Sequence, residues 1–158
     1  MLYALLKTLH LLSIVVWIGG MVFAHFFLRP AIGVLEPAVR VRLMHAVLGR
    51  FFTAVLITSM LSLVTGLWMI GNVAKQLSQA GVSFKMPIEW TIMATLGIVM
   101  MLIFGHIRFA LYKRLGRAVQ AADWPAGGVV LAKIRVGVVV NLCLGVLIVG
   151  VIRLGVPS

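Results

Sequence analysis

Four histidines are the residues of this sequence best suited to chemistry, because they lie in or beside strongly apolar segments. His10 and His25 fall in the first apolar run, His45 precedes the second, and His106 lies in the third. An ionisable residue inside a bilayer costs about 2.5–3.5 kcal/mol on insertion scales, so it marks a functional site by default. A neutral imidazole is also the commonest metal ligand and a frequent haem ligand. The pattern therefore predicts a functional site inside a membrane, with a metal ion or haem as candidate ligands.

The composition is that of an integral membrane protein. Of its 158 residues, 63% are hydrophobic and only 11% are charged, and the mean hydropathy is +1.17. Soluble domains are about 45–50% apolar and about 25% charged. A span across the hydrocarbon core takes about 20 apolar residues, and the chain has four such runs. We expect one all-α domain, residues 1–158, folded as a four-transmembrane-helix bundle with spans at about 3–28, 51–71, 88–110 and 133–154. The first run is expected to be a retained helix and not a signal peptide, because it is too long and contains Lys7.

The net charge of +11 comes from 14 basic residues against three acids. Nucleic-acid binding is not expected, because the basic residues flank apolar runs and form no patch with interleaved aromatics. The positive-inside rule explains them better and puts the first and third connections in the cytoplasm, with both termini outside. Ten of the basic residues flank those two connections: Arg29, Arg40, Arg42, Arg50, Arg108, Lys113, Arg114, Arg117, Lys133 and Arg135.

Local signals predict where the spans end and how the connections behave. Residues 36–48 mix apolar and basic residues, which favours a short interfacial helix that leads into the second span, with Arg40 and Arg42 near lipid phosphates. The basic part of the third connection is expected to extend the third span along the cytoplasmic lipid surface. Breakers and caps are predicted at Arg29-Pro30, Gly71-Asn72, Met86-Pro87 and Asp123.

Stripes of small and polar residues predict which faces of the second and fourth spans point into the bundle. Small residues let membrane helices approach closely, and hydroxyl or amide groups bond across the contact. The stripes are Thr58, Ser62 and Gly66 in the second span, and Gly137, Asn141 and Gly145 in the fourth.

The depth of each histidine follows from the helical rise. His25 lies fifteen residues after His10, so it is about 22 Å deeper at 1.5 Å per residue. His25, His45 and His106 are thus expected at one cytoplasmic level, with His10 alone near the outer face. On regular helices both His10 and His25 can look into the bundle. His106 shares its face with Thr91 and Thr95, so we expect it to point inward as well.

The chemistry expected near His10 differs from that of the inner level. Thioether and imidazole ligands together suit Cu(I). Simpler roles stay open for the other histidines: His45 would be solvated or would contact lipid phosphate, while His25 and His106 would hydrogen-bond across helices. The residues expected around His10 are Lys7, Met69, Met86 and Glu89.

Several residue patterns that other functions need do not occur in this sequence. The acids Glu36, Glu89 and Asp123 all lie at span ends or in connections, which argues against a proton-coupled transporter. No serine–histidine–acid set, glycine-rich phosphate loop or Cys-x-x-Cys pair occurs, so hydrolytic and nucleotide chemistry have no support. Cys143 is the single cysteine, which leaves no intramolecular disulfide.

The opening LLKTLHLLSIVVWIGGMVFAHFFLRPA resembles the first helix of the CopD family, bacterial inner-membrane proteins named for copper resistance. Lys7, His10, Trp17, Gly19 and Gly20 carry this likeness. The stretches GHIRFALYKRLGRAVQAADWP and KIRVGVVVNLCLG are similar to the second half of the same family. The first helix is also similar to that of HemJ-type protoporphyrinogen oxidases, which bind haem b, with His106 in a comparable place on the third span.

Three hypotheses stay open, of which the resemblances imply the first two. In the first, a bundle in the bacterial inner membrane binds a copper ion through His10, with His25 and His106 as an inner pair, and takes part in copper handling or transport. A homodimer or a periplasmic copper-binding protein would then be its partner, and enzymatic activity is not implied. In the second, haem b lies between His25 and His106, Lys7 and inner arginines pair with its propionates, and the protein is a redox enzyme or carrier. In the third, a non-catalytic assembly bundle uses the histidines only as hydrogen-bond partners.

Overall fold

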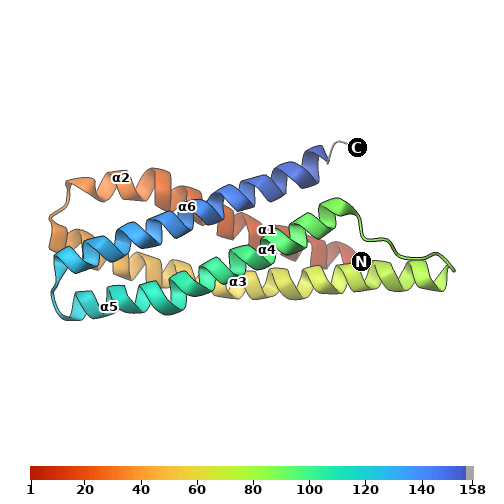
Figure 1. Ribbon diagram of the computed structural model, residues 1–158, viewed down its shortest axis with the longest axis horizontal. Coiled ribbons are helices and arrows are strands. Elements are labelled where there is room, and N and C mark those ends of the chain that lie inside the picture. The colour runs from red at the N-terminus through yellow and green to blue at the C-terminus, as the bar shows by residue number, and fades with distance from the viewer. Residues whose placement is uncertain (156–158) are drawn as a thin grey trace.

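The computed structural model describes residues 1–155, which form four long helical rods running side by side in alternating directions (Figure 1). Each rod is long and apolar enough to cross a membrane. The described residues contain no strand. The prediction of an all-α bundle with four spans is confirmed. The rods are Leu2–Val34, Pro37–Gln79, Ile88–Gln120 and Trp124–Leu154.

The first and third rods change helix type along their length, whereas the second and fourth are continuous. Each of the two interrupted rods contains a stretch of π-helix, a wider turn that is often found at functional positions. The first rod is α1 (Leu2–Val22), the π-helix η1 (Phe23–Leu28), α2 (Arg29–Ala31) and the 3₁₀ turn η2 (Ile32–Val34). The third is α4 (Ile88–His106), the π-helix η3 (Ile107–Leu111) and α5 (Tyr112–Gln120). The second and fourth rods are α3 (Pro37–Gln79) and α6 (Trp124–Leu154).

Several predicted helix ends are wrong because the helices run further than expected. The segment 36–48 is no separate interfacial helix but forms the first turns of α3, whose 43 residues span about 65 Å at 1.5 Å each. Gly71-Asn72 does not end α3, because a glycine inside a helix costs only about 1 kcal/mol. Pro30 does not end the first rod either, which stays helical to Val34. The π turns of η1 end at Leu28, two residues before Pro30, at a point where the helical hydrogen-bond register changes.

Two predicted helix starts are confirmed. Pro87 is the residue that precedes α4, with an extended backbone and a carbonyl that accepts the first helical hydrogen bonds. The Asp123 carboxylate caps α6 by accepting a hydrogen bond from the Ala126 backbone N–H at 2.9 Å. This side chain satisfies one of the donors that the first turn of a helix leaves free.

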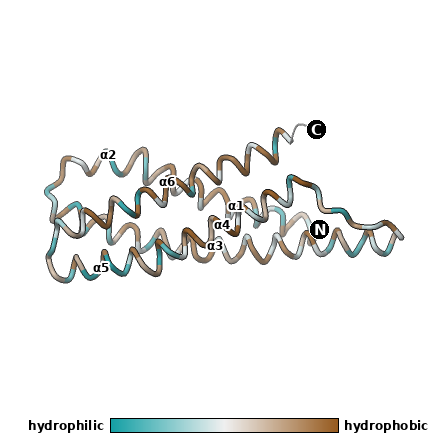
Figure 2. Tube along the Cα trace, viewed as in Figure 1, coloured by the Kyte–Doolittle hydropathy of each residue, from teal (hydrophilic) through white to brown (hydrophobic). Residues whose placement is uncertain are grey.

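The two ends of the bundle differ in polarity. One end of the bundle carries α2, η2, α5 and the starts of α3 and α6, and we call it the basic end (Figure 1). In Figure 2 hydrophilic residues gather in α5 at this end and near the C-terminal end of α3 at the other, while the middle of the rods is mostly hydrophobic. The connections between the first two rods and between the last two both lie at the basic end, as the charge pattern requires.

Aromatic rings and small residues form the interior between the rods. Trp17 and Phe52 both pack edge-on against Phe104, with ring centroids 6.0 and 5.9 Å apart. Asn141 donates a hydrogen bond to the Met100 carbonyl at 3.1 Å, which joins α6 to α4.

The small-residue stripes lie in this interior, as the sequence predicts. Ser62 is buried, and a methyl group added at Gly145 would lie 3.1 Å from Ile18 on α1. Gly137 is as closely packed, since a Cβ there would meet the Ile107 side chain at 2.7 Å. Large apolar side chains such as Leu102 and Phe27 instead face outward, where a bilayer would cover them.

Candidate metal site

His10 is a half-buried residue of α1 whose ring is held by α3. Its Nδ1 atom lies 3.0 Å from the Ser62 carbonyl oxygen and 3.1 Å from the Thr65 hydroxyl oxygen. A carbonyl only accepts hydrogen bonds, so Nδ1 must carry the proton. The Thr65 hydroxyl donates to the Leu61 carbonyl at 2.7 Å, which leaves its oxygen free to accept from Nδ1. In neutral His10 the lone pair is therefore on Nε2, the form in which a histidine binds a metal.

The position of the His10 ring depends on close packing between α1 and α3. A Cβ atom at Gly66 would lie 3.3 Å from His10 Cε1, closer than most side-chain contacts. Gly66 thus leaves room for the imidazole beside α3. The expected stripe Thr58, Ser62 and Gly66 contributes to this contact through Ser62 and Gly66, which also line the cavity next to the ring.

His10 opens into a cavity of about 160 Å³ between α1, α3, α4 and α6. Three thioethers from α4 line the same cavity: Met93, Met100 and Met101. Ser62 also lines it, and the hydroxyl oxygen of this residue is buried without a hydrogen-bond partner within residues 1–155. The remaining walls are apolar, and no carboxylate is among the lining residues. The cavity therefore combines one imidazole with methionine residues in mostly apolar surroundings.

The neighbours that the sequence predicted for His10 are not the ones that the fold supplies. Lys7 is exposed, and neither Met69, Met86 nor Glu89 is among the residues that line the cavity. Sequence reasoning missed the α4 methionines, although their spacing gives a usable signal. Met93, Gly97 and Met101 recur every four residues, so they share one face of α4, with Met100 beside them.

The other three histidines occupy separate environments. His25 lies half-buried in η1 and lines a different and larger cavity at the basic end. His45 stacks on Tyr112, with ring centroids 4.9 Å apart and ring planes within 8°, and the Tyr112 hydroxyl donates to the His45 carbonyl at 3.1 Å. His106 is exposed and lines neither cavity.

The prediction that His106 points into the bundle is wrong. The buried face of the third rod is apolar and includes Met100, Phe104 and Ile107. Thr91, on the face of His106, satisfies its hydroxyl within its own helix by bonding to the Pro87 carbonyl at 3.2 Å. A hydroxyl that is satisfied locally needs no partner in the interior, so it does not mark the inward face.

The three inner histidines do not assemble into a ligand cluster. Within the described part of the chain, no group of three or more histidine, cysteine, aspartate or glutamate residues is placed to hold a metal ion. The paired arrangement expected for haem needs both His25 and His106 to face the interior, and only His25 lines a cavity. The site with the most suitable donors is therefore the cavity beside His10.

Together, the fold and this cavity define a four-span membrane protein with an imidazole and thioethers between its helices. The family model for copper resistance protein D, CopD, matches residues 45–154, more than half of the chain. The chain belongs to the CopD family, and the resemblance to CopD is confirmed, while that to HemJ-type oxidases stays a prediction. No curated protein and no solved structure matches this chain. The matched region begins within α3 and includes the methionines of α4. It leaves out α1, so the family match does not extend to His10.

Proposed function

We propose that this CopD-family protein binds a copper ion in the cavity beside His10 and takes part in copper handling across the membrane. The observation that carries the proposal is the hydrogen bond from His10 Nδ1 to the Ser62 carbonyl, which leaves Nε2 free as a ligand. Metal-binding histidines usually donate their other ring nitrogen to such a backbone carbonyl. The CopD family, whose name refers to copper resistance, is consistent with copper as the cargo.

The donor set favours Cu(I) over harder cations. Imidazole and thioether groups are soft ligands that bind Cu(I) well, whereas Mg²⁺ and Ca²⁺ require several oxygen ligands. The cavity offers Met93, Met100 and Met101 and no carboxylate. Copper would be held here as transported or buffered cargo, in a complex that keeps the +1 charge of Cu(I) because its donors are neutral.

The charge distribution suggests how the protein is oriented. Ten of its 14 basic residues flank the two connections at the basic end, so the positive-inside rule would place that end in the cytoplasm. His10 would then lie toward the outer face of a bacterial inner membrane. Copper delivered from the periplasm, by a copper-binding protein or as the free ion, would reach this cavity first.

Competition for Cu(I) with a chromophoric chelator tests the proposal directly. We expect the detergent-purified protein to bind about one Cu(I) per chain. His10→Ala should weaken binding by about 100-fold or more, since even the loss of a group that hydrogen-bonds to a metal ligand costs about 10–100-fold in metal affinity. His106→Ala is the matched control, because this histidine is exposed and should leave the affinity unchanged. Equal affinity of wild type and His10→Ala would refute the proposed site.

A further inference from the structure

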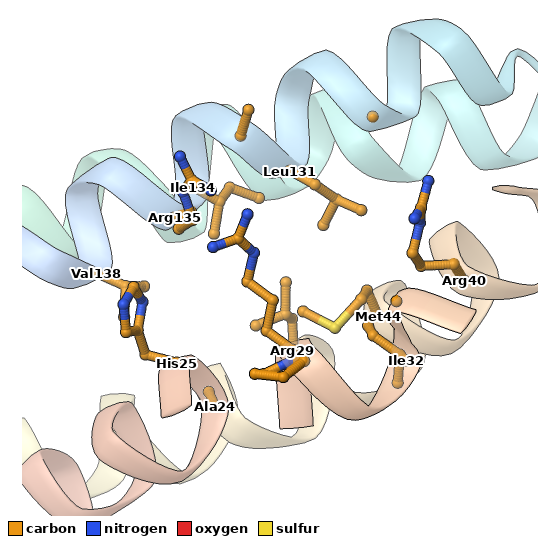
Figure 3. Close-up of a pocket in the computed structure, with 15 residues that line it drawn as sticks. Ala24, His25, Arg29, Ile32, Arg40, Met44, Leu131, Ile134, Arg135 and Val138 are labelled. Atoms are coloured by element: carbon orange, nitrogen blue, oxygen red, sulfur yellow. The ribbon is translucent and has the colours of Figure 1, made fainter. Parts of the chain in front are cut away.

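A second, larger cavity at the basic end has a different chemistry from the His10 site. It measures about 450 Å³ and lies between the first rod, α6 and the start of α3. Four side chains that can carry positive charge line it: His25, Arg29, Arg40 and Arg135. We call this space the cationic cleft. Figure 3 shows Arg29 extending from the first rod toward α6, with His25 reaching into the same space and Arg40 further along.

No acidic residue balances this charge within the cleft, since none of the lining residues is aspartate or glutamate. The whole chain has only three acids. Asp123 caps α6, Glu89 lies in the first turn of α4 at the opposite end, and Glu36 is an exposed residue before α3. Several guanidinium groups that converge on one space without a carboxylate favour a bound anion, and arginine is the side chain best suited to phosphate.

The cleft is also apolar over much of its wall. Ile32 and Leu48 line it from the first two rods, and Leu131, Ile134 and Val138 line it along α6. A volume of about 450 Å³ exceeds what a single inorganic phosphate needs and lies within the range of pockets for larger ligands. The ligand that fits such walls has an anionic head and an apolar body.

The position of the cleft points to the source of this ligand. The cleft lies where the apolar part of the helices gives way to the basic end of the bundle. With spans of this length across a bilayer, this part of the protein would lie at the level of the lipid headgroups. Anionic lipids concentrate at membrane surfaces that face such basic segments. A free phosphate would gain nothing from the apolar wall of α6.

We propose that the cationic cleft binds one acidic phospholipid, with its phosphate between Arg29 and Arg135 and an acyl chain along the α6 wall at Leu131. The lipid would join the first and fourth rods at the basic end. Neither Arg29 nor Arg135 lines the His10 cavity, so this binding site does not depend on copper binding.

Native mass spectrometry of the full-length protein released from detergent tests the proposal. The probes are phosphatidylglycerol, phosphatidylcholine with the same acyl chains, and inorganic phosphate as a competitor. The test variant is Arg29→Gln with Arg135→Gln, and the control is Arg114→Gln with Arg117→Gln, which removes the same charge from exposed positions of α5. The expected result is one retained phosphatidylglycerol per chain, with affinity reduced about tenfold or more only in the cleft variant.

Three results would overturn the proposal. Equal retention of phosphatidylcholine would show that the headgroup charge is not recognised, and full displacement by inorganic phosphate would assign the site to free phosphate. An equal loss of phosphatidylglycerol affinity in the control pair would show that the effect comes from the net charge alone. Because the double variant could fail to fold, Leu131→Gln is tested as well. It keeps every arginine and should still weaken phosphatidylglycerol binding, whereas unchanged binding would contradict the role of the apolar wall.

Discussion

Two adjacent glycines of α1 allow a close test of how the first two rods pack. Gly19 has no atom within 4 Å of the place where a Cβ would lie. A Cβ at Gly20 would overlap the Phe51 ring on α3, with Cζ at 2.9 Å and Cδ2 at 3.0 Å and Cε2 closer still. We therefore expect Gly19→Ala to be tolerated and Gly20→Ala to force α1 and α3 apart or to displace the ring.

The magnitude follows from comparing the two variants with each other. Both gain about 1 kcal/mol of helix propensity on replacing glycine by alanine, so this contribution cancels in the comparison. The remaining difference is the cost of overpacking, about 1–3 kcal/mol. Gly20→Ala should thus be less stable than Gly19→Ala by that amount.

Equilibrium unfolding of both proteins in mixed micelles, followed by circular dichroism, measures this difference in the free energy of unfolding. Adding Phe51→Ala to each variant is the control, because removing the ring should abolish the difference between the two glycine positions. Equal stability of the two single variants would refute the close contact between α1 and α3, and with it the placement of His10 against α3.

Two further predictions concern polar contacts at the basic end. Asp123→Ala should lower stability by about 1 kcal/mol through loss of the α6 cap, whereas Asp123→Asn should retain most of it; equal thermal midpoints of the two variants would contradict the capping role. Tyr112→Phe should cost about 0.5–1.5 kcal/mol, because it removes the hydrogen bond to the His45 carbonyl and keeps the ring stacking. The exposed Tyr3→Phe is the control in the same thermal scan, and equal shifts in both would count against the contact.

The sequence was sufficient to predict the four spans, because length and apolar composition decide whether a helix can cross a bilayer. It also identified the interior of the second and fourth rods through Ser62, Asn141 and Gly145, since small and polar residues mark helix contacts in membranes. Asp123 was recognisable as a cap because its side chain acts locally, over three residues. The span lengths and the Asp123 cap depend on neighbours in the sequence, and the stripes of small residues can be recognised from their spacing along one helix.

The orientation of the third rod was harder to predict, for a physical reason. In a membrane protein the outside of a helix is as apolar as its buried face, so hydrophobic periodicity does not separate Leu102, which is exposed, from Phe104, which is buried. The hydroxyls of that rod suggested the wrong face because Thr91 bonds within its own helix. The methionines of the His10 cavity were missed because a methionine resembles any apolar residue of a span, although Met93 and Met101 share one face of α4.

X-ray absorption spectroscopy at the copper edge, on the purified protein loaded with one equivalent of Cu(I), tests the proposed copper site most directly. We predict one imidazole nitrogen together with sulfur scatterers, and loss of the sulfur signal when Met93, Met100 and Met101 are replaced by leucine. A spectrum with nitrogen and oxygen ligands alone, unchanged by these replacements, would contradict copper binding beside His10.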